Sequence, residues 1–293
     1  MIDKLKSITL VSENFDLKKY NTFKLESTAK YFIRPLNVEE LINVLKVLND
    51  YNQKYFIIGN GSNILLPFYY DGVIIKLDKL NNYSIENDVL LCESGCMINK
   101  LASITANKGY SGLDFAVGIP GTIGASVYGN AGCYGSSISD SLISATVFDG
   151  KKIIELTNKD FEFDYRESKL KKDKNNYVVL SCKFKLNKSN KEELKQLIIE
   201  RTNKRIASQD LSHPSNGSMF RNPPGLIAGK LIDDLGLKGY KVGDAMVSFK
   251  HANFIINDGN AKVEDVIKLI EKIKKDVKEK YNVDLVLEQE IIK

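Results

Sequence analysis

Three polar residues, far apart in this chain of 293 residues, could serve in acid–base or electrostatic catalysis. Arg166 stands in FDYRESKL just after a strand-like segment, Ser218 follows a glycine in SNGSMFRNPPG, and Glu290 lies in LEQEII near the end. Each also fits an ordinary role: a surface ion pair with Glu167, a turn hydroxyl, or a solvent-facing carboxylate on an edge strand. Only their combination would indicate a function.

A short segment with two glycines, IIGNGSNILL (57–66), could be a hairpin or a loop that holds a ligand. Asn-Gly between apolar runs usually signals a two-residue β-hairpin turn. Here the closing pair would be Gly59 and Ser62, and neither has the bulk that stabilises cross-strand pairing. The sequence therefore favours a loop over 59–63, either an ordinary tight loop or a nest of backbone N–H groups that binds an anion. The segment is not the GxGxxG of a Rossmann fold.

A second glycine-dense segment runs from Gly109 to Gly135 and has neither helical nor strand periodicity. Such a density of glycine costs conformational entropy unless the backbone must lie against something. GIPGTIG (118–124) and GNAG (129–132) could together wrap a dinucleotide. A long irregular loop without function is the alternative, although loops of this length are uncommon and usually functional.

The elements around these segments alternate between strand and helix, which indicates an α/β or α+β fold. Periodicity and capping predict helices, and apolar runs predict strands. Helices are expected over 37–51, 98–107, 191–206, 226–235 and 263–281, with Asn37 capping the first and a capping box of Ser189 and Glu192 before the third. Strands are expected over 55–59, 72–77, 88–95, 252–257 and 283–292, and a hairpin that turns at Asp149-Gly150.

The composition indicates a globular protein with a solvated, mixed-charge surface. Lys and Arg exceed Asp and Glu by 42 to 37, and the lysines are scattered, so no nucleic-acid partner is expected. No apolar run reaches the length of a membrane span and the first residues do not resemble a signal peptide, so we expect a cytoplasmic protein without a membrane partner. The four cysteines are expected to be reduced, and no metal site is expected because the two histidines lack ligand spacing.

Taken in order along the chain, these motifs resemble one family, the UDP-N-acetylenolpyruvoylglucosamine reductases (MurB) of bacterial cell-wall synthesis. The matching stretches cover nearly the whole chain, about residues 21 to 290. They are NTF, IIGNGSNILL, GLDFAVGIPGTIGASVYGNAGCYG, YRES, PSNGSMFRNPPGLIAGKLIDDLGLKG, KHANFI and LEQEI. About ten residues separate Ser168 from YVVL, which is similar to the subclass without a long insertion.

The resemblance implies an α+β fold with an FAD-binding domain of the PCMH or vanillyl-alcohol-oxidase type. We expect this domain over 1–190, with two α+β subdomains that split near 78, and a C-terminal α+β substrate-binding domain over 200–293. FAD would contact the GNGSN loop through its pyrophosphate and the glycine-rich segment elsewhere. The residues expected to bind FAD are Gly59, Asn60, Gly61, Ser62, Asn63, Gly118, Ile119, Pro120, Gly121, Thr122, Gly124, Ala125, Ser126, Asn130 and Gly132.

The reaction that the resemblance implies is NADPH-dependent reduction of UDP-N-acetylglucosamine enolpyruvate to UDP-N-acetylmuramate, a step of peptidoglycan precursor synthesis. Arg166 would stabilise the charge that develops on the substrate carboxylate, because a preorganised cation lowers the free energy of the transition state. Ser218 would deliver the proton to the carbanion, and a partly protonated Glu290 would donate a hydrogen bond or the proton. Substrate contacts are expected from Tyr165, Arg221 and Asn222.

Two other interpretations stay open on the sequence. One is another FAD-linked oxidase or dehydrogenase of the same fold that acts on a sugar or alcohol, and the other is a flavin or nucleotide-sugar sensor without activity. Several positions also depart from the family pattern: Ala125, Ser126, Gly129, and Arg221 in place of a frequent lysine, and an arginine fork does not hold a phosphate as a lysine does. A monomer is favoured, although the sequence does not determine the oligomeric state.

Overall fold

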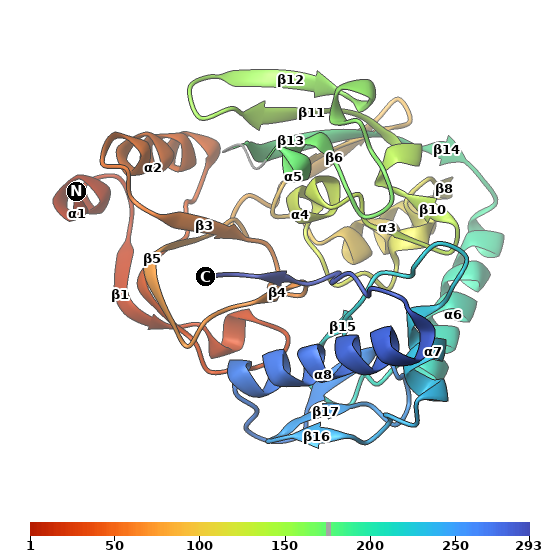
Figure 1. The fold of residues 1–293 in the computed structure, drawn as a ribbon. Helices are drawn as coiled ribbons and strands as arrows, with labels where there is room; N and C mark the ends of the chain where they lie inside the picture. The colour runs from red at the N-terminus through yellow and green to blue at the C-terminus, as the bar shows by residue number, and fades with distance from the viewer. Residues whose placement is uncertain (174–176) are drawn as a thin grey trace. The chain divides into compact units, whose positions relative to one another are not determined.

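The computed structural model describes residues 1–173 and 177–293, and Figure 1 shows the path of the chain. The residues group into two compact units, each discontinuous in sequence. The first unit contains Met1–Glu13, Tyr31–Asn60 and Gly72–Lys204, and the second contains Asn14–Lys30, Gly61–Asp71 and Arg205–Lys293. The two-domain division expected from the sequence, with a boundary between 190 and 200, stays a prediction.

A five-stranded sheet with the order β12-β11-β13-β7-β6 forms the main layer of the first unit, and every pairing in it is antiparallel. Its strands are β6 (Tyr83–Glu86), β7 (Val89–Glu93), β11 (Leu142–Phe148), β12 (Ile153–Thr157) and β13 (Val178–Lys185). Helices α3 (Ile98–Asn107) and α4 (Ile123–Tyr128) share a buried cluster with this sheet. The cluster fixes the glycine-dense segment against the sheet because α4 is part of that segment.

A four-stranded sheet has the order β1-β2-β5-β3. Its strands are β1 (Val11–Asp16), β2 (Thr28–Ile33), β3 (Tyr55–Ile58) and β5 (Tyr69–Lys76). A second buried cluster of the first unit joins α1 (Ile2–Lys6) and α2 (Val38–Asp50) with apolar residues of this sheet and of β13. Strand β13 thus contributes side chains to both clusters of that unit.

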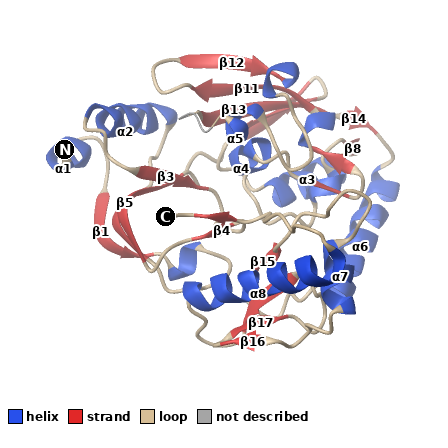
Figure 2. Ribbon diagram, viewed as in Figure 1, coloured by secondary structure: helices blue, strands red, loops and turns tan. Residues whose placement is uncertain are grey.

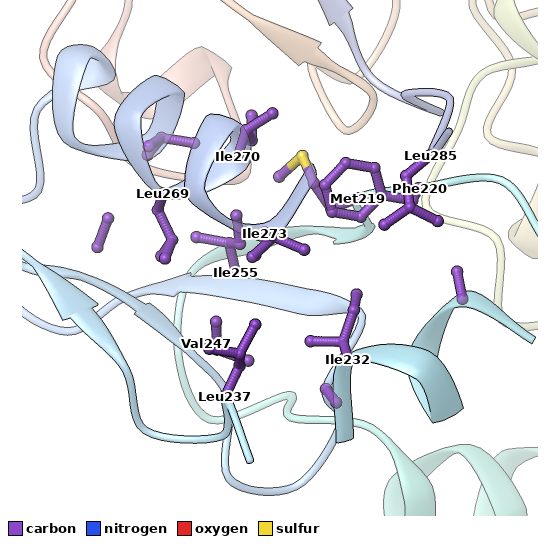
Figure 3. Packing of buried hydrophobic residues seen from close by; sticks show 14 of the residues in the cluster. Met219, Phe220, Ile232, Leu237, Val247, Ile255, Leu269, Ile270, Ile273 and Leu285 are labelled. Carbon is purple, nitrogen blue, oxygen red and sulfur yellow. The ribbon is translucent and has the colours of Figure 1, made fainter. Parts of the chain in front are cut away.

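The second unit is built on a sheet of order β15-β18-β17-β16 packed against a long helix. The elements are β15 (Ser215–Ser218), β16 (Lys241–Val242), β17 (Ala245–Val247), β18 (Phe254–Asn257), α7 (Ala228–Asp234) and α8 (Val263–Tyr281). Figure 3 shows Leu269 and Ile273 of α8 between the helix and the sheet, next to Ile255. Burial of this apolar face stabilises the unit because each such side chain removed from water contributes about 1.5–3 kcal/mol.

Shorter elements complete the chain. They are the helices α5 (Lys169–Lys172) and α6 (Lys191–Ser208), the 3₁₀ helices η1 (Lys18–Tyr20), η2 (Asp114–Ala116), η3 (Ile138–Asp140) and η4 (Asn158–Phe161), and the strands β4 (Ile64–Leu65), β8 (Tyr110–Ser111), β9 (Gly132–Cys133), β10 (Ser136–Ser137), β14 (Asn187–Lys188) and β19 (Glu290–Ile291). No helix in the described ranges is both long and apolar enough to cross a membrane.

Several elements match their sequence predictions closely. Helices α3 and α8 have the predicted bounds, and α2 begins after Asn37, whose side chain accepts a hydrogen bond from the Glu40 N–H at 2.9 Å. The hairpin turns as expected, since the Asp149 N–H donates to the Lys152 carbonyl and Gly150 has a φ of +95°. The mixed α+β class is confirmed.

Other expectations are wrong in detail. The cap of α6 is Asn190 rather than Ser189, because the Asn190 side chain accepts from the Glu192 N–H while the Ser189 N–H pairs with the Gly109 carbonyl. The strand expected over 283–292 is reduced to β19. The segment 109–135 also contains the helix α4, which was not predicted because the segment is rich in glycine. Part of the short connection after Ser168, residues 174–176, lies outside the described residues.

Candidate active site

The segment over 59–63 is a loop between strands that do not pair with each other. Strand β3 pairs in parallel with β5, and β4 pairs in parallel with β19 at the other end of the chain. Figure 2 shows the irregular connection between β3 and β4. The hairpin alternative is therefore excluded, and the prediction of a loop is confirmed.

The structure brings the beginning of this loop against the glycine-dense segment. The Asn60 side chain donates a hydrogen bond from Nδ2 to the Pro120 carbonyl at 2.8 Å. A Cβ at Gly59 would lie 2.5 Å from the Thr122 hydroxyl oxygen and 3.1 Å from the Ala125 methyl group. Two predicted cofactor segments, 62 residues apart in sequence between Asn60 and Thr122, thus share one surface of the first unit.

Both segments contain polar groups that could donate hydrogen bonds to a pyrophosphate. Within the described chain, no backbone N–H of Asn60, Gly61 or Ser62 donates a hydrogen bond to a protein acceptor. The Ser126 hydroxyl on α4 is buried and also has no partner among the described residues. Successive unpaired N–H groups form an anion-binding nest, and buried polar atoms are normally satisfied. The residues present therefore fit FAD, whose pyrophosphate is anionic.

Two glycines of these segments are also required for close packing within the protein, which the sequence interpretation did not include. A Cβ at Gly61 would meet the Tyr20 carbonyl oxygen at 2.1 Å, and one at Gly124 would meet the Ser94 Cβ at 2.9 Å. Real Cβ atoms do not approach other atoms so closely. Close contact between backbone segments thus requires these glycines before any ligand is considered.

We predict that Gly61→Ala destabilises the protein far more than Gly135→Ala. Both glycines have positive φ, +67° and +80°, so alanine costs each roughly 1–2 kcal/mol of backbone strain. Only Gly61 also meets the Tyr20 carbonyl, because nothing lies within 4 Å of a Cβ at Gly135. Urea unfolding of the flavin-free proteins measures the difference, and the flavin-to-protein absorbance ratio follows cofactor content. Equal free energies of unfolding for the two variants would contradict this prediction.

Arg166 lies in a tight turn of the first unit, between the bridge partners Asp164 and Glu167. It does not follow a strand as expected, since η4 precedes the turn. Arg166 has a φ of +57°, uncommon for a residue with a side chain and often found where function fixes the backbone. Its Nη2 donates to the Gly132 carbonyl at 2.5 Å, so its guanidinium lies against the glycine-dense segment.

Ser218 is the last residue of β15 and follows a distortion of the strand. Gly217 has a φ of +74°, and the register with β18 shifts between Ser215 and Ser218. Such bulges redirect the next side chain. The Ser218 hydroxyl is half-buried and makes no hydrogen bond within the described ranges, which leaves both its proton and its lone pairs available. Ser218 is therefore at a distorted strand end, and the ordinary alternative of a hydroxyl in a simple turn does not describe it.

Glu290 is brought close to Ser218 within the second unit by backbone and side-chain hydrogen bonds. The Glu290 N–H donates to the Asn63 carbonyl at 3.0 Å, which attaches β19 to the end of the 59–63 loop. The neighbouring Gln289 side chain donates from Nε2 to the carbonyls of Asn216 and Ser218 at 2.8 and 3.0 Å. Ser218 and Glu290 are thus on adjoining segments, and Arg166 belongs to the first unit.

The other predicted residues have defined structural partners. Tyr165 is 52% exposed and its ring lies 5.3 Å from the Arg166 guanidinium carbon. The Arg221 Nε lies 3.6 Å from a carboxylate oxygen of Glu288, and the Asn222 side chain accepts from the Ala228 N–H at the start of α7. These contacts orient the expected substrate residues.

Asn130 is held by the protein at both ends of its amide. Its Nδ2 donates to the Asp164 carbonyl at 2.9 Å and its Oδ1 accepts from the Ser139 N–H at 3.1 Å. Asn130 therefore connects the glycine-dense segment to the turn that carries Arg166. Its expected contact with FAD would use the amide hydrogen or the oxygen lone pair that these two hydrogen bonds leave free.

Sequence reasoning missed a set of residues that fix the loop and the serine strand. Thr22 donates from its hydroxyl to the Asn216 Oδ1 at 2.7 Å, and Asn216 donates from Nδ2 to the Ile64 carbonyl at 2.6 Å. Gln289 belongs to the same set because its side chain donates to the Asn216 and Ser218 carbonyls. Lys76 was also missed, although a lysine inside the apolar stretch GVIIKL was a visible signal.

Comparison with known proteins gives one consistent result. Residues 29–155 match the family described as FAD binding domain, and residues 209–292 match UDP-N-acetylenolpyruvoylglucosamine reductase, C-terminal domain. The UDP-N-acetylenolpyruvoylglucosamine reductase of Caldicellulosiruptor saccharolyticus is 43% identical over 282 residues, 94% of this chain and 90% of that protein. That of Caldanaerobacter subterraneus is 39% identical over 297 residues, 100% of this chain and 98% of that protein. The crystal structure of MurB from Thermus caldophilus superposes with a TM-score of 0.82 at 31% identity, covering 97% of this chain and 99% of that one.

Proposed function

The chain belongs to the UDP-N-acetylenolpyruvoylglucosamine reductase family, and we propose that Arg166, Ser218 and Glu290 divide the work of its reaction among them. It is a flavin-dependent oxidoreductase that uses FAD and NADPH in peptidoglycan precursor synthesis. The observation that carries the proposal is the hydrogen bond from the Gln289 side chain to the Ser218 carbonyl, because Gln289 directly precedes Glu290 and the bond brings the two segments together. We further propose that the enzyme works in the cytoplasm as a monomer.

The cofactor would be held by the 59–63 loop at its pyrophosphate and by residues 118–132 elsewhere. When bound, FAD would supply the two-electron chemistry that links NADPH to the enol ether. The protein contributes the unpaired N–H groups of the loop, the Ser126 hydroxyl, and a backbone fixed by the Asn60 bond to Pro120. These groups bind and orient without taking part in electron transfer.

Arg166 has the chemistry to stabilise the substrate carboxylate. Reduction at the terminal carbon of the enolpyruvyl group leaves negative charge on the neighbouring carbon, and this charge delocalises into a carboxylate that is already anionic. A fixed cation beside that carboxylate lowers the barrier because it needs no reorganisation when the charge develops. The hydrogen bond to Gly132 holds the Arg166 guanidinium in place.

The free hydroxyl of Ser218 supports its role as the proton donor. A donor must come within about 3 Å of the carbon that takes the proton. The bulge at Gly217 directs the side chain, and Gln289 fixes the carbonyl of the same residue. The backbone at Ser218 is therefore fixed, and its hydroxyl can donate to a ligand without breaking a hydrogen bond within the described protein.

Glu290 would act beside the substrate carboxylate as a neutral hydrogen-bond donor. Two carboxyl groups in contact cannot both ionise easily, so one keeps its proton. The side chain is half-buried and makes no hydrogen bond within the described residues. It can therefore turn to a ligand at no cost in protein contacts.

We predict that Glu290→Gln keeps turnover within about tenfold of the wild type, whereas Glu290→Ala loses at least about 100-fold, a typical contribution of a positioned acid–base group. Glutamine can donate the same hydrogen bond from its amide, and alanine cannot. Steady-state turnover with the enolpyruvyl nucleotide-sugar measures both variants. Equal losses in the two variants would instead show that Glu290 itself transfers a proton.

A further inference from the structure

A groove on the first unit lies between helix α2 and the hairpin of β11 and β12, which are labelled in Figure 1. Its volume is about 420 Å³. No residue that lines it belongs to the segments expected to bind FAD or to the residues expected to contact the substrate. The proposed reaction therefore gives this groove no role.

The floor of the groove is apolar, and one of its side chains is strongly exposed. Val38 and Ile42 lie one turn apart on α2, and Phe148 and Ile153 are opposite each other in the hairpin. Phe148 is buried, whereas Ile153 is 50% exposed. Exposed apolar surface that is rimmed by polar residues is typical of an interaction site.

Three lysines line the same groove and give it positive charge. Lys46 lies on α2, and Lys151 and Lys152 lie in the turn of the hairpin. None of their three ammonium groups forms an ion pair or a hydrogen bond with another described residue. Among the described residues that line the groove, Glu39 is the only acid. The lysines are therefore available to the carboxylates of a partner.

The walls of the groove are fixed by the protein itself. The Asp149 side chain accepts from the backbone N–H groups of Lys151 and Lys152, both at 2.8 Å. These two bonds lower the pKa of Asp149 more than attraction to the two ammonium groups does, so the carboxylate mainly holds the turn. Asn49 of α2 donates from Nδ2 to the Gly150 carbonyl at 3.4 Å, which joins the helix to the hairpin. A preformed groove reduces the entropy lost on binding.

The length and chemistry of the groove indicate what it binds. Helix α2 rises about 12 Å from Val38 to Lys46, at roughly 1.5 Å per residue, which equals about four residues of an extended chain. A flat lipid surface cannot enter a concave groove, and a purely anionic chain would leave the apolar floor uncovered. We propose that this groove binds an acidic segment of a partner protein, with apolar side chains against Ile42 and Ile153 and carboxylates beside the lysines.

The test measures binding of a short labelled peptide, in which glutamate and leucine alternate, to the flavin-loaded protein by fluorescence anisotropy. The double variant Lys46→Glu and Lys151→Glu should weaken binding at least about tenfold, since two ion pairs become repulsive. The control is the double variant Lys268→Glu and Lys274→Glu, which reverses two exposed charges on α8 in the second unit. The control should stay within about threefold of the wild type.

A salt series and a second variant separate the charge from the apolar floor. The defect of the lysine variant should largely disappear near 1 M salt, where the Debye length is about 3 Å. Ile153→Thr keeps a β-branched side chain in the strand but removes apolar surface, so it should weaken the peptide about fivefold at low and high salt alike. A peptide with serine in place of leucine should show the same weakening or more.

Backbone NMR locates the peptide on the protein. Its addition should shift the amide resonances of α2 and of the hairpin turn, including Ile42 and Ile153. Four results would overturn the inference: no binding up to about millimolar peptide, the range of the weakest specific complexes; equal binding by the groove and control variants; equal binding of the serine peptide; or shifts confined to other elements. Anionic vesicles that bind the wild type and not the lysine variant would also overturn it, because the partner would then be a lipid surface.

Discussion

Replacing Ser218 with alanine should leave reduction of the bound flavin by NADPH within about threefold of the wild-type rate and slow its reoxidation by the enolpyruvyl substrate by about 10²–10⁴-fold. The first half-reaction needs no proton from the protein, whereas the second requires one at the carbanion carbon. Ser218 is suited to supply it because Gly217 redirects its side chain and its hydroxyl has no partner in the described chain. Stopped-flow absorbance of the flavin measures the two half-reactions separately.

Ser215→Ala provides the matched control for this prediction. Ser215 lies on the same strand, pairs with Ile256 of β18 and is half-buried like Ser218. Its replacement should change neither half-reaction. A Ser218→Ala enzyme that completes reoxidation within tenfold of the wild-type rate would mean that the proton comes from elsewhere.

Replacing Arg166 with methionine should slow reoxidation by the substrate about 10²–10³-fold, the usual effect of removing one preorganised electrostatic contact. Arg166→Lys should recover only part of this loss, since an ammonium does not reproduce the planar fork of a guanidinium. The same stopped-flow experiment measures both variants. A loss confined to the first half-reaction would contradict the proposed contact with the substrate carboxylate.

The hydrogen bond from Arg166 to Gly132 makes a second control necessary, because losing it could loosen the cofactor segment. FAD affinity of the flavin-free variants tests this directly and should fall by no more than about 10- to 150-fold, since one hydrogen bond from a charged group contributes about 1.5–3 kcal/mol. Lys169→Met removes a nearby positive charge that pairs with Glu162 on the surface, at 2.8 Å. That variant should behave as the wild type in both half-reactions.

Local sequence signals were sufficient for the regular elements. Helix α2 could be predicted because Asn37 caps it and its apolar positions repeat at helical spacing, and α8 because its apolar stripe runs unbroken over its whole length. The loop over 59–63 could be separated from a hairpin because Gly59 and Ser62 lack the bulk for a closing pair. These predictions depend on residues close together in the chain.

Interactions between residues far apart in the chain could not be predicted from local sequence signals. Gln289 contacts Asn216 and Ser218 across more than 70 residues, and no local pattern shows which strand it meets. Lys76 contacts Gly59 only because β3 and β5 pair in parallel. Helix α4 escaped prediction because glycine is a poor helix former, and its position is set by packing with the five-stranded sheet.

The assignment of Arg166, Ser218 and Glu290 came from the resemblance and not from any single residue. Each had an ordinary alternative, and all three have surroundings in the structure that differ from that alternative. Arg166 contacts the Gly132 carbonyl in addition to being near Glu167, and Ser218 is on a bulged strand end and not in a simple turn. Glu290 is half-buried and not fully exposed to solvent.

The central claim is that one flavin site takes electrons from NADPH and passes them to the enolpyruvyl nucleotide-sugar. The most direct test is an anaerobic absorbance experiment on the flavin-loaded protein: reduce it with one equivalent of NADPH, then add UDP-N-acetylglucosamine enolpyruvate. We expect the oxidised-flavin bands to return promptly, with one equivalent of UDP-N-acetylmuramate formed. Bands that return only when air is admitted would contradict the claim and favour an oxidase of the same fold.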